Sequence, residues 1–185
     1  MTVLSPLPTF YSDCWFKSRL EARWAVFFDA LNIGWEYEAE GYDTGPLGWY
    51  LPDFWLPDYD LYIEVKPQNH LTDEEFAITV VKVNQLRNGD QNALLICGSP
   101  GKDNYVVADY FDSDTEEIFA LDPVCDCLVL VGQATPQTQL RRNPCGMPEC
   151  CSESATHPHY GLDHSYAQAR SYMFSAGPSS SRPVR

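Results

Sequence analysis

Two acidic residues and one lysine in this chain have the types and the spacing that phosphate chemistry requires. Asp53 follows Pro52 after a short apolar stretch, and Glu64 and Lys66 lie two positions apart in the segment 61–66. Side chains alternate between the two faces of a strand, so Glu64 and Lys66 share one face while the apolar residues beside them anchor the other face in the core. If the two strands are neighbours, Asp53 can approach Glu64.

Two carboxylates held close together repel each other, and a divalent cation that prefers oxygen ligands removes this repulsion. A lysine beside such a cation can position a water molecule or stabilise the charge that develops on a phosphate. Glu64 and Lys66 alone are more typical of a solvated edge strand, because short motifs often occur by chance. With Pro52 and Asp53 upstream, a metal site and a solvated strand are both open interpretations.

The segments around these residues alternate between helical and extended patterns. Ser18 and Glu21 have the spacing of a capping box, and apolar residues then recur at helical spacing to Leu31. This predicts a first helix that stops at 32–34, where Gly34 suits the left-handed turn that ends helices. Strands are predicted at 35–38, at 49–56 with a break at Pro52, at 61–66, at 93–97 and at 105–110, and a second helix at 72–87. The order helix, three strands, helix, strand predicts an α/β fold with a mixed sheet flanked by helices.

Composition limits the classes of function. The chain has 185 residues and a formal net charge of −14, which argues against a protein that coats DNA through a basic face but not against a nuclease whose carboxylates bind a metal. Its length suits one hydrophobic core, and no apolar run approaches the roughly 20 residues that a membrane helix needs. With no secretory signal at the N-terminus, we expect a cytoplasmic protein without membrane contact.

Four segments follow one another in the order and spacing of a known superfamily. They are SRLEARWA at 18–25, WEYE at 35–38, YLPDF at 50–54 and IEVK at 63–66. This pattern resembles the PD-(D/E)XK nuclease superfamily, above all its small phage and actinobacterial members, over about residues 16–100. The resemblance implies a restriction-endonuclease-like αβββαβ core at 17–118 and a phage- or bacterium-encoded, intracellular deoxyribonuclease, more an endonuclease than an exonuclease.

The resemblance also implies a site for Mg²⁺ or Mn²⁺, whose ligands carried over by position are Asp53, Glu64, the Val65 carbonyl and Glu21. Lys66 would then serve the attacking water. Glu21 has a second interpretation, since as the third residue of a capping box it could serve only Ser18. DNA is the implied substrate, and a homodimer or a phage DNA-processing assembly is the implied protein partner.

Two other functions stay open beside the nuclease. The negative charge suits a catalytically silent module that keeps the nuclease fold, or a subunit of a phage replication or recombination assembly whose partner grips the DNA. Arg19 and Arg23 could contact phosphate or be ordinary exposed helix residues, and Gln85 could be an extra polar site residue or a surface residue. Tyr50 and Trp55 are more typical of core aromatics than of base-stacking surfaces.

Seven cysteines fall into two groups. Cys14 and Cys97 have apolar neighbours, which favours small core residues, and the other five lie between 125 and 151. Relatives of the resembled superfamily often carry a zinc-ribbon-like insert, here 119–160, followed by a helix, here 161–174. The candidate zinc ligands are Cys125, Cys127, Cys145 and Cys150. Free thiols are the alternative, because neither close pair has the tight C-x₂-C spacing.

The two ends of the chain are predicted to lie outside the core. Residues 1–16 are rich in proline and aromatic residues, and we expect an extended lead-in. Residues 175–185 are small and polar, which predicts a disordered tail.

Overall fold

The structure is a computed structural model that describes residues 6–67, 73–88, 92–101, 105–108, 117–121, 128–132 and 162–177. Its strands are β1 (Thr9–Tyr11), β2 (Cys14–Phe16), β3 (Glu36–Tyr37), β4 (Tyr42–Asp43), β5 (Trp49–Tyr50), β6 (Phe54–Leu56), β7 (Leu61–Lys66), β8 (Asn92–Gly98), β9 (Tyr105–Ala108), β10 (Glu117–Leu121) and β11 (Leu128–Gly132). Its helices are α1 (Arg19–Ala30), α2 (Asp73–Asn88) and α3 (Asp163–Ser171), with short 3-10 turns η1 (Gly45–Leu47) and η2 (Pro57–Tyr59).

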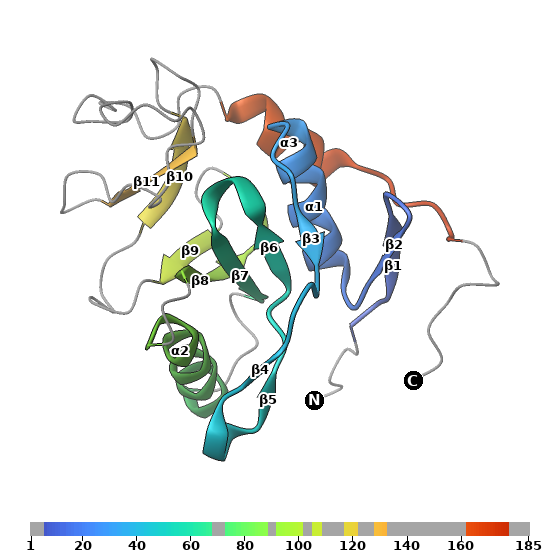
Figure 1. Cartoon of the computed structure of the whole chain (residues 1–185). Coiled ribbons are helices and arrows are strands. Elements are labelled where there is room, and N and C mark those ends of the chain that lie inside the picture. The colour runs from blue at the N-terminus through green and yellow to red at the C-terminus, as the bar shows by residue number, and fades with distance from the viewer. Residues whose placement is uncertain are drawn as a thin grey trace.

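Seven strands form one mixed sheet in the order β11-β10-β9-β8-β7-β6-β3 (Figure 1). The pairs β3–β6, β6–β7 and β8–β9 are antiparallel, whereas β7 and β8 are parallel and are joined through α2. A parallel pair needs such a crossover connection, usually a helix. The predicted mixed sheet flanked by helices is therefore confirmed. Between α1 and α2 the chain also forms β4 and β5, which the predicted order of three strands did not include as separate strands.

Helices cover the two faces of the sheet. Ile63 and Val65 of β7 pack in one hydrophobic cluster with residues of α1, and Tyr62 packs in a second cluster with Val83 of α2. Figure 1 shows α1 and α2 on opposite sides of the strands. Because side chains alternate along a strand, the even-numbered residues of β7 face the α2 side.

The first helix begins and ends where local chemistry requires. The Ser18 side chain accepts a hydrogen bond from the backbone N–H of Glu21, at 3.2 Å, as the capping box predicts. Trp24 and Phe27 are fully buried. The helix ends before the predicted stop at 32–34, and the residue in the left-handed conformation is Asn32, with φ of 56°, rather than Gly34.

The second helix forms despite a β-branched middle. Predicted at 72–87, it spans Asp73–Asn88. The Thr79 hydroxyl donates to the Glu75 carbonyl, at 2.9 Å, which satisfies this polar group inside the helix. Val83 and Leu86 are buried against the sheet, so packing offsets the weak helix propensity of Ile78 to Val81.

Two ribbons differ from the prediction. The expected lead-in 1–16 contains the hairpin β1–β2, because Ser12 and Asp13 have φ of 47° and 58°, the pattern of a type I′ turn. The segment 49–56 breaks at Pro52 as predicted, but its two halves join different sheets: β5 pairs with β4 in a separate ribbon, whereas β6 joins the main sheet. A proline cannot continue a ladder, so the chain changes partner there.

The later segments continue the fold. The antiparallel strands β10 and β11 extend the sheet, so the expected boundary between 118 and 119 falls inside β10. Near the C-terminus, Tyr166 of α3 stacks on Phe27 of α1 with ring centroids 5.1 Å apart. The chain then reaches Gly177, where an added Cβ would clash with Phe10 and Trp15, so residues 175–177 of the expected tail lie against the first hairpin. Within the described ranges, no helix has both the length and the apolar character to cross a membrane.

Candidate active site

The predicted acidic pair comes together on two neighbouring antiparallel strands. Phe54 of β6 lies opposite Ile63 of β7, so the same register sets Asp53 opposite Glu64. Residues directly opposite in an antiparallel pair point to the same face, with Cβ atoms about 5 Å apart. Both carboxylates are buried, with 6% of each residue exposed. The convergence of the two acids was predicted, and the register provides it.

Asp53 is fixed by backbone on both sides. Its carboxylate Oδ2 accepts a hydrogen bond from the Val65 amide, at 2.8 Å, and its carbonyl accepts one from the Glu38 amide, at 3.0 Å. β7 extends past the first residue of β6, so the Val65 amide has no ladder partner at this position and the Asp53 side chain takes that place. The site therefore lies just before the first residue of β6, where β7 continues and its partner strand does not.

Glu64 is held between two donors on the α2 face. Its Oε1 pairs with the Lys66 ammonium, and its Oε2 accepts a hydrogen bond from the Tyr50 hydroxyl, at 2.9 Å. Lys66 follows at the end of β7 on the same face and is partly exposed. The three predicted polar residues thus form one cluster, joined by a tyrosine that the sequence favoured as a simple core residue.

The cluster carries more negative than positive charge. Burial and the charge of Glu64 raise the pKa of Asp53 well above its usual range, although Lys66 and the Val65 amide act in the opposite direction. Burial lowers the pKa of Lys66, but the charges of Glu64 and Asp53 outweigh it and raise that pKa. Lys66 therefore stays cationic, and one cation faces two buried carboxylates.

Glu21 forms the predicted capping box. Its Oε1 accepts from the Ser18 hydroxyl at 2.6 Å, and its Oε2 accepts from the Lys17 amide at 3.1 Å and from the Tyr37 hydroxyl at 2.5 Å. Its charge still contributes to the raised pKa of Asp53, so it lies near the cluster. Within the described ranges, however, no three Asp, Glu, His or Cys side chains gather into a group that could hold a metal ion.

Glu21 therefore takes part in the capping of α1 and also accepts from Lys17 and Tyr37, and its role as a metal ligand stays a prediction. The helix that carries Glu21 packs on the face of the sheet opposite to Glu64. A cation held by Asp53 and Glu64 would take its further ligands from the Val65 carbonyl, water or a phosphate.

Two residues of the site were not selected from the sequence. Tyr50 donates to Glu64, and Lys82 of α2 places its ammonium 5.9 Å from the centroid of the Tyr50 ring. Tyr50 does pack in the hydrophobic core as expected, yet a buried tyrosine usually finds a partner for its hydroxyl. Applied to Tyr50, which lies beside two buried acids, this rule could have identified the tyrosine as part of the site.

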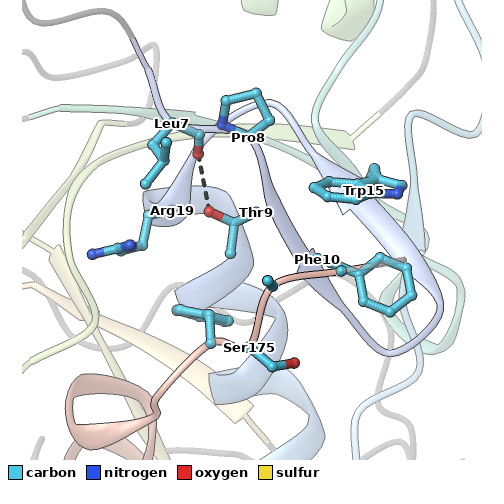
Figure 2. Close-up of a pocket in the computed structure, with 10 residues that line it drawn as sticks. Leu7, Pro8, Thr9, Phe10, Trp15, Arg19 and Ser175 are labelled. Atoms are coloured by element: carbon cyan, nitrogen blue, oxygen red, sulfur yellow. Dashed lines mark hydrogen bonds between the residues drawn. The ribbon is translucent and has the colours of Figure 1, made fainter. Parts of the chain in front are cut away.

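The two arginines of α1 lie away from the acidic cluster. The Arg23 guanidinium donates to the carbonyls of Ala169 and Arg170, at 2.6 and 2.5 Å, so it binds the end of α3. Arg19 lines a separate pocket of about 490 Å³ between the β1–β2 hairpin and the chain after α3 (Figure 2). Neither arginine joins Asp53 or Glu64 in the contacts that the structure describes.

The predictions for the cysteines concern two groups, the core cysteines and the candidate zinc ligands. Cys97 is buried and Cys14 is half-buried, and burial raises the pKa of each thiol to about 11, so both are inert core residues as predicted. The candidate zinc ligands, Cys125, Cys127, Cys145 and Cys150, lie outside the described residues.

Comparisons of the chain with protein-family models, with curated proteins and with solved structures gave no match. The geometry of the described residues and the sequence motifs therefore carry the functional argument by themselves.

Proposed function

We propose that the chain is a metal-dependent deoxyribonuclease of the PD-(D/E)XK type, more an endonuclease than an exonuclease. The observation that carries this proposal is the buried pair of Asp53 and Glu64 on adjacent strands with Lys66 on the same face. The order α1, β3, β6, β7, α2, β8 and the mixed sheet support the restriction-endonuclease-like αβββαβ core within this proposal.

The donor set suits Mg²⁺ or Mn²⁺. Two carboxylates offer the hard oxygen ligands that these cations prefer, and the shortage of positive charge at Asp53 is the condition that a bound cation relieves. Asp53, Glu64 and the Val65 carbonyl would hold it. When bound, such a cation supplies positive charge to phosphate oxygens and makes a water molecule more acidic.

The side chains of the cluster have separate tasks in phosphodiester hydrolysis. The Lys66 ammonium donates hydrogen bonds that orient the attacking water and stabilise negative charge on the phosphate in the transition state. Glu64 holds Lys66 in place through its ion pair, and the Tyr50 hydroxyl fixes the other oxygen of Glu64. The Val65 amide holds the Asp53 carboxylate in place through the hydrogen bond to its Oδ2.

Cleavage of a supercoiled plasmid in Mg²⁺, in Mn²⁺ and in EDTA tests this function. We expect cleavage by the wild type only with the cations, and a loss of at least roughly 100-fold for Lys66→Met, the size typical of a hydrogen-bond donor that stabilises transition-state charge. Lys17→Met is the matched control, because Lys17 also pairs with a glutamate, Glu38, outside the cluster. Wild-type rates for Lys66→Met would refute the role of this lysine.

A second candidate is a nuclease subunit that works within a DNA-processing assembly. The net charge of −14 favours it, because a partner would then supply the basic surface that grips DNA. Purified chain that binds Mn²⁺ through Asp53 and Glu64 but cleaves no plasmid would support this candidate over an independent enzyme.

A further inference from the structure

Lys82 of α2 is connected to the acidic cluster through Tyr50. Its ammonium is 5.9 Å from the centroid of the Tyr50 ring, and the Tyr50 hydroxyl donates to Glu64 at 2.9 Å. Tyr50 and Val83 belong to the hydrophobic cluster on the α2 face of the sheet. Lys82 therefore adds a second ammonium to the α2 face of the sheet, the face that also carries Lys66.

No carboxylate of the described part of the chain pairs with Lys82. The ion pairs of that part join Lys17 to Glu38 and Lys66 to Glu64. On a helix, neighbours lie three and four positions apart, and for Lys82 these are Ile78, Thr79, Gln85 and Leu86, none of them acidic. Among the side chains that the structure describes, this half-buried lysine lies beside a tyrosine and pairs with no carboxylate, so its charge is available for an external anion.

The arginines whose side chains the structure describes lie on α1 and α3. Arg23 binds backbone carbonyls at the end of α3, and Arg19 lines the pocket beside the first hairpin. A chain with a net charge of −14 needs a local positive patch to hold a nucleic-acid strand. Near the acidic cluster, Lys66 and Lys82 supply that patch.

We propose that Lys82 is a substrate-binding residue that contacts a backbone phosphate of DNA next to the phosphate held at Lys66. This inference rests on the proposed nuclease function and adds a second phosphate contact to the same site. A lysine binds phosphate as a mobile point charge, and the contact with the Tyr50 ring holds the Lys82 ammonium beside the acidic cluster, within reach of a strand bound at Lys66. The contact positions DNA and carries no base specificity.

A purely structural role would give a different result. Lys82 could simply pack on the face of Tyr50, a cation–π contact that contributes about 0.5–1 kcal/mol at an exposed site. Losing that contact lowers the melting temperature but leaves the salt dependence of DNA binding unchanged. Losing a phosphate contact reduces the slope of log K against log salt by about 0.9 for duplex DNA and about 0.7 for a single strand.

The test is fluorescence anisotropy with labelled duplex and single-stranded DNA in EDTA, over a salt series, so that no metal-dependent cleavage occurs. For Lys82→Met we expect roughly tenfold weaker binding, the loss typical of a hydrogen bond to a charged group, together with the reduced slope. Lys82→Arg should restore both. Arg170→Met, which removes an exposed cation from α3, is the control matched in charge and should bind as the wild type does.

The outcomes separate this inference from the nuclease proposal. An unchanged slope and affinity for Lys82→Met overturn it, even if the wild type cleaves DNA and even if the variant melts earlier. Absence of DNA binding by the wild type also overturns it. The expected changes support it as a binding site even if plasmid cleavage with Mg²⁺ is not seen, in which case only the hydrolytic role fails. If cleavage is seen, Lys82→Met should raise KM more than it lowers kcat.

Discussion

The surroundings of Asp53 are unfavourable for the charge of its own carboxylate. It is buried opposite Glu64, and its carboxylate receives one amide hydrogen bond, from Val65. A binding site often tolerates such a cost, because the ligand removes it. At the scale of single residues, the metal-free protein therefore stores an electrostatic penalty that a cation or a neutral side chain would relieve.

Asp53→Asn should raise the melting temperature measured in EDTA while it abolishes metal-dependent cleavage. A carboxylate with a raised folded-state pKa contributes stability that is present below its unfolded pKa, about 3.9, and is lost as pH rises through the folded value. Asparagine has no such loss and can still accept the Val65 hydrogen bond. The gap between variant and wild type should thus widen as pH rises above about 4.

Thermal unfolding followed by circular dichroism at several pH values measures this gap. For a chain of this size, each 1 kcal/mol shifts the melting temperature by about 2–4 °C. Asp58→Asn, at an exposed aspartate, is the control and should leave the curve unchanged. A variant less stable than the wild type at neutral pH would show that Asp53 is a structural residue rather than a strained ligand.

The sequence alone predicted the acidic residues of the site, but it did not predict the residues that hold them in place. Side chains alternate along β7 and place Glu64 and Lys66 on one face, which the amino-acid sequence alone predicts. That Tyr50 donates to Glu64 depends on a contact between two separate sheets of the chain. Lys82 reaches the site through the packing of α2, which no local pattern encodes.

At the scale of the elements, Glu21 in the first turn of α1 has two possible roles, as part of the helix cap and as a metal ligand. Both oxygens of Glu21 are engaged by Ser18, Lys17 and Tyr37. Glutamine at this position preserves a capping box but removes the charge that a metal ligand needs. The two assignments of Glu21 can therefore be separated by one substitution.

Glu21→Gln should keep plasmid cleavage within a few-fold of the wild type and change stability by less than about 1 kcal/mol. Ser18→Ala, which removes the cap itself, should cost about 1 kcal/mol. Initial cleavage rates and urea unfolding measure the two effects. A loss of cleavage by Glu21→Gln as large as that by Asp53→Asn would make Glu21 a ligand and not only a cap.

Element prediction succeeded where a local signal and tertiary packing agree. α1 has a capping box and an apolar stripe, and β7 has Tyr62, Ile63 and Val65 as strand formers, so both were predicted close to their observed bounds. The ribbons β1–β2 and β4–β5 were not predicted as such. Their strands have two or three residues, and the first turn uses Ser12 and Asp13 rather than glycine.

At the scale of the whole molecule, the C-terminal helix completes the core that the first helix begins. Tyr166 has 1% of its surface exposed and stacks on Phe27, and Arg23 of α1 binds the carbonyls of Ala169 and Arg170. These contacts join segments almost 150 residues apart, at separations of 146 and 147. A helix at the end of the sequence was predictable, but its partner was not.

Tyr166→Ala should destabilise the protein by about 3 kcal/mol or more, as expected for truncating a buried aromatic. Gln168→Ala, at an exposed position of the same helix, should change stability by less than about 0.5 kcal/mol. Urea unfolding followed by tryptophan fluorescence measures both. If the two variants were equally stable, α3 would be a peripheral helix and not part of the core.

The central claim is that Asp53 and Glu64 together bind one divalent cation. Electron paramagnetic resonance of Mn²⁺ titrated into the purified protein tests it most directly, with Glu64→Gln as the comparison, since glutamine can still accept the Tyr50 hydrogen bond. We predict one Mn²⁺ site in the wild type and a dissociation constant at least roughly tenfold higher in Glu64→Gln. Equal Mn²⁺ binding by the two proteins would contradict the account.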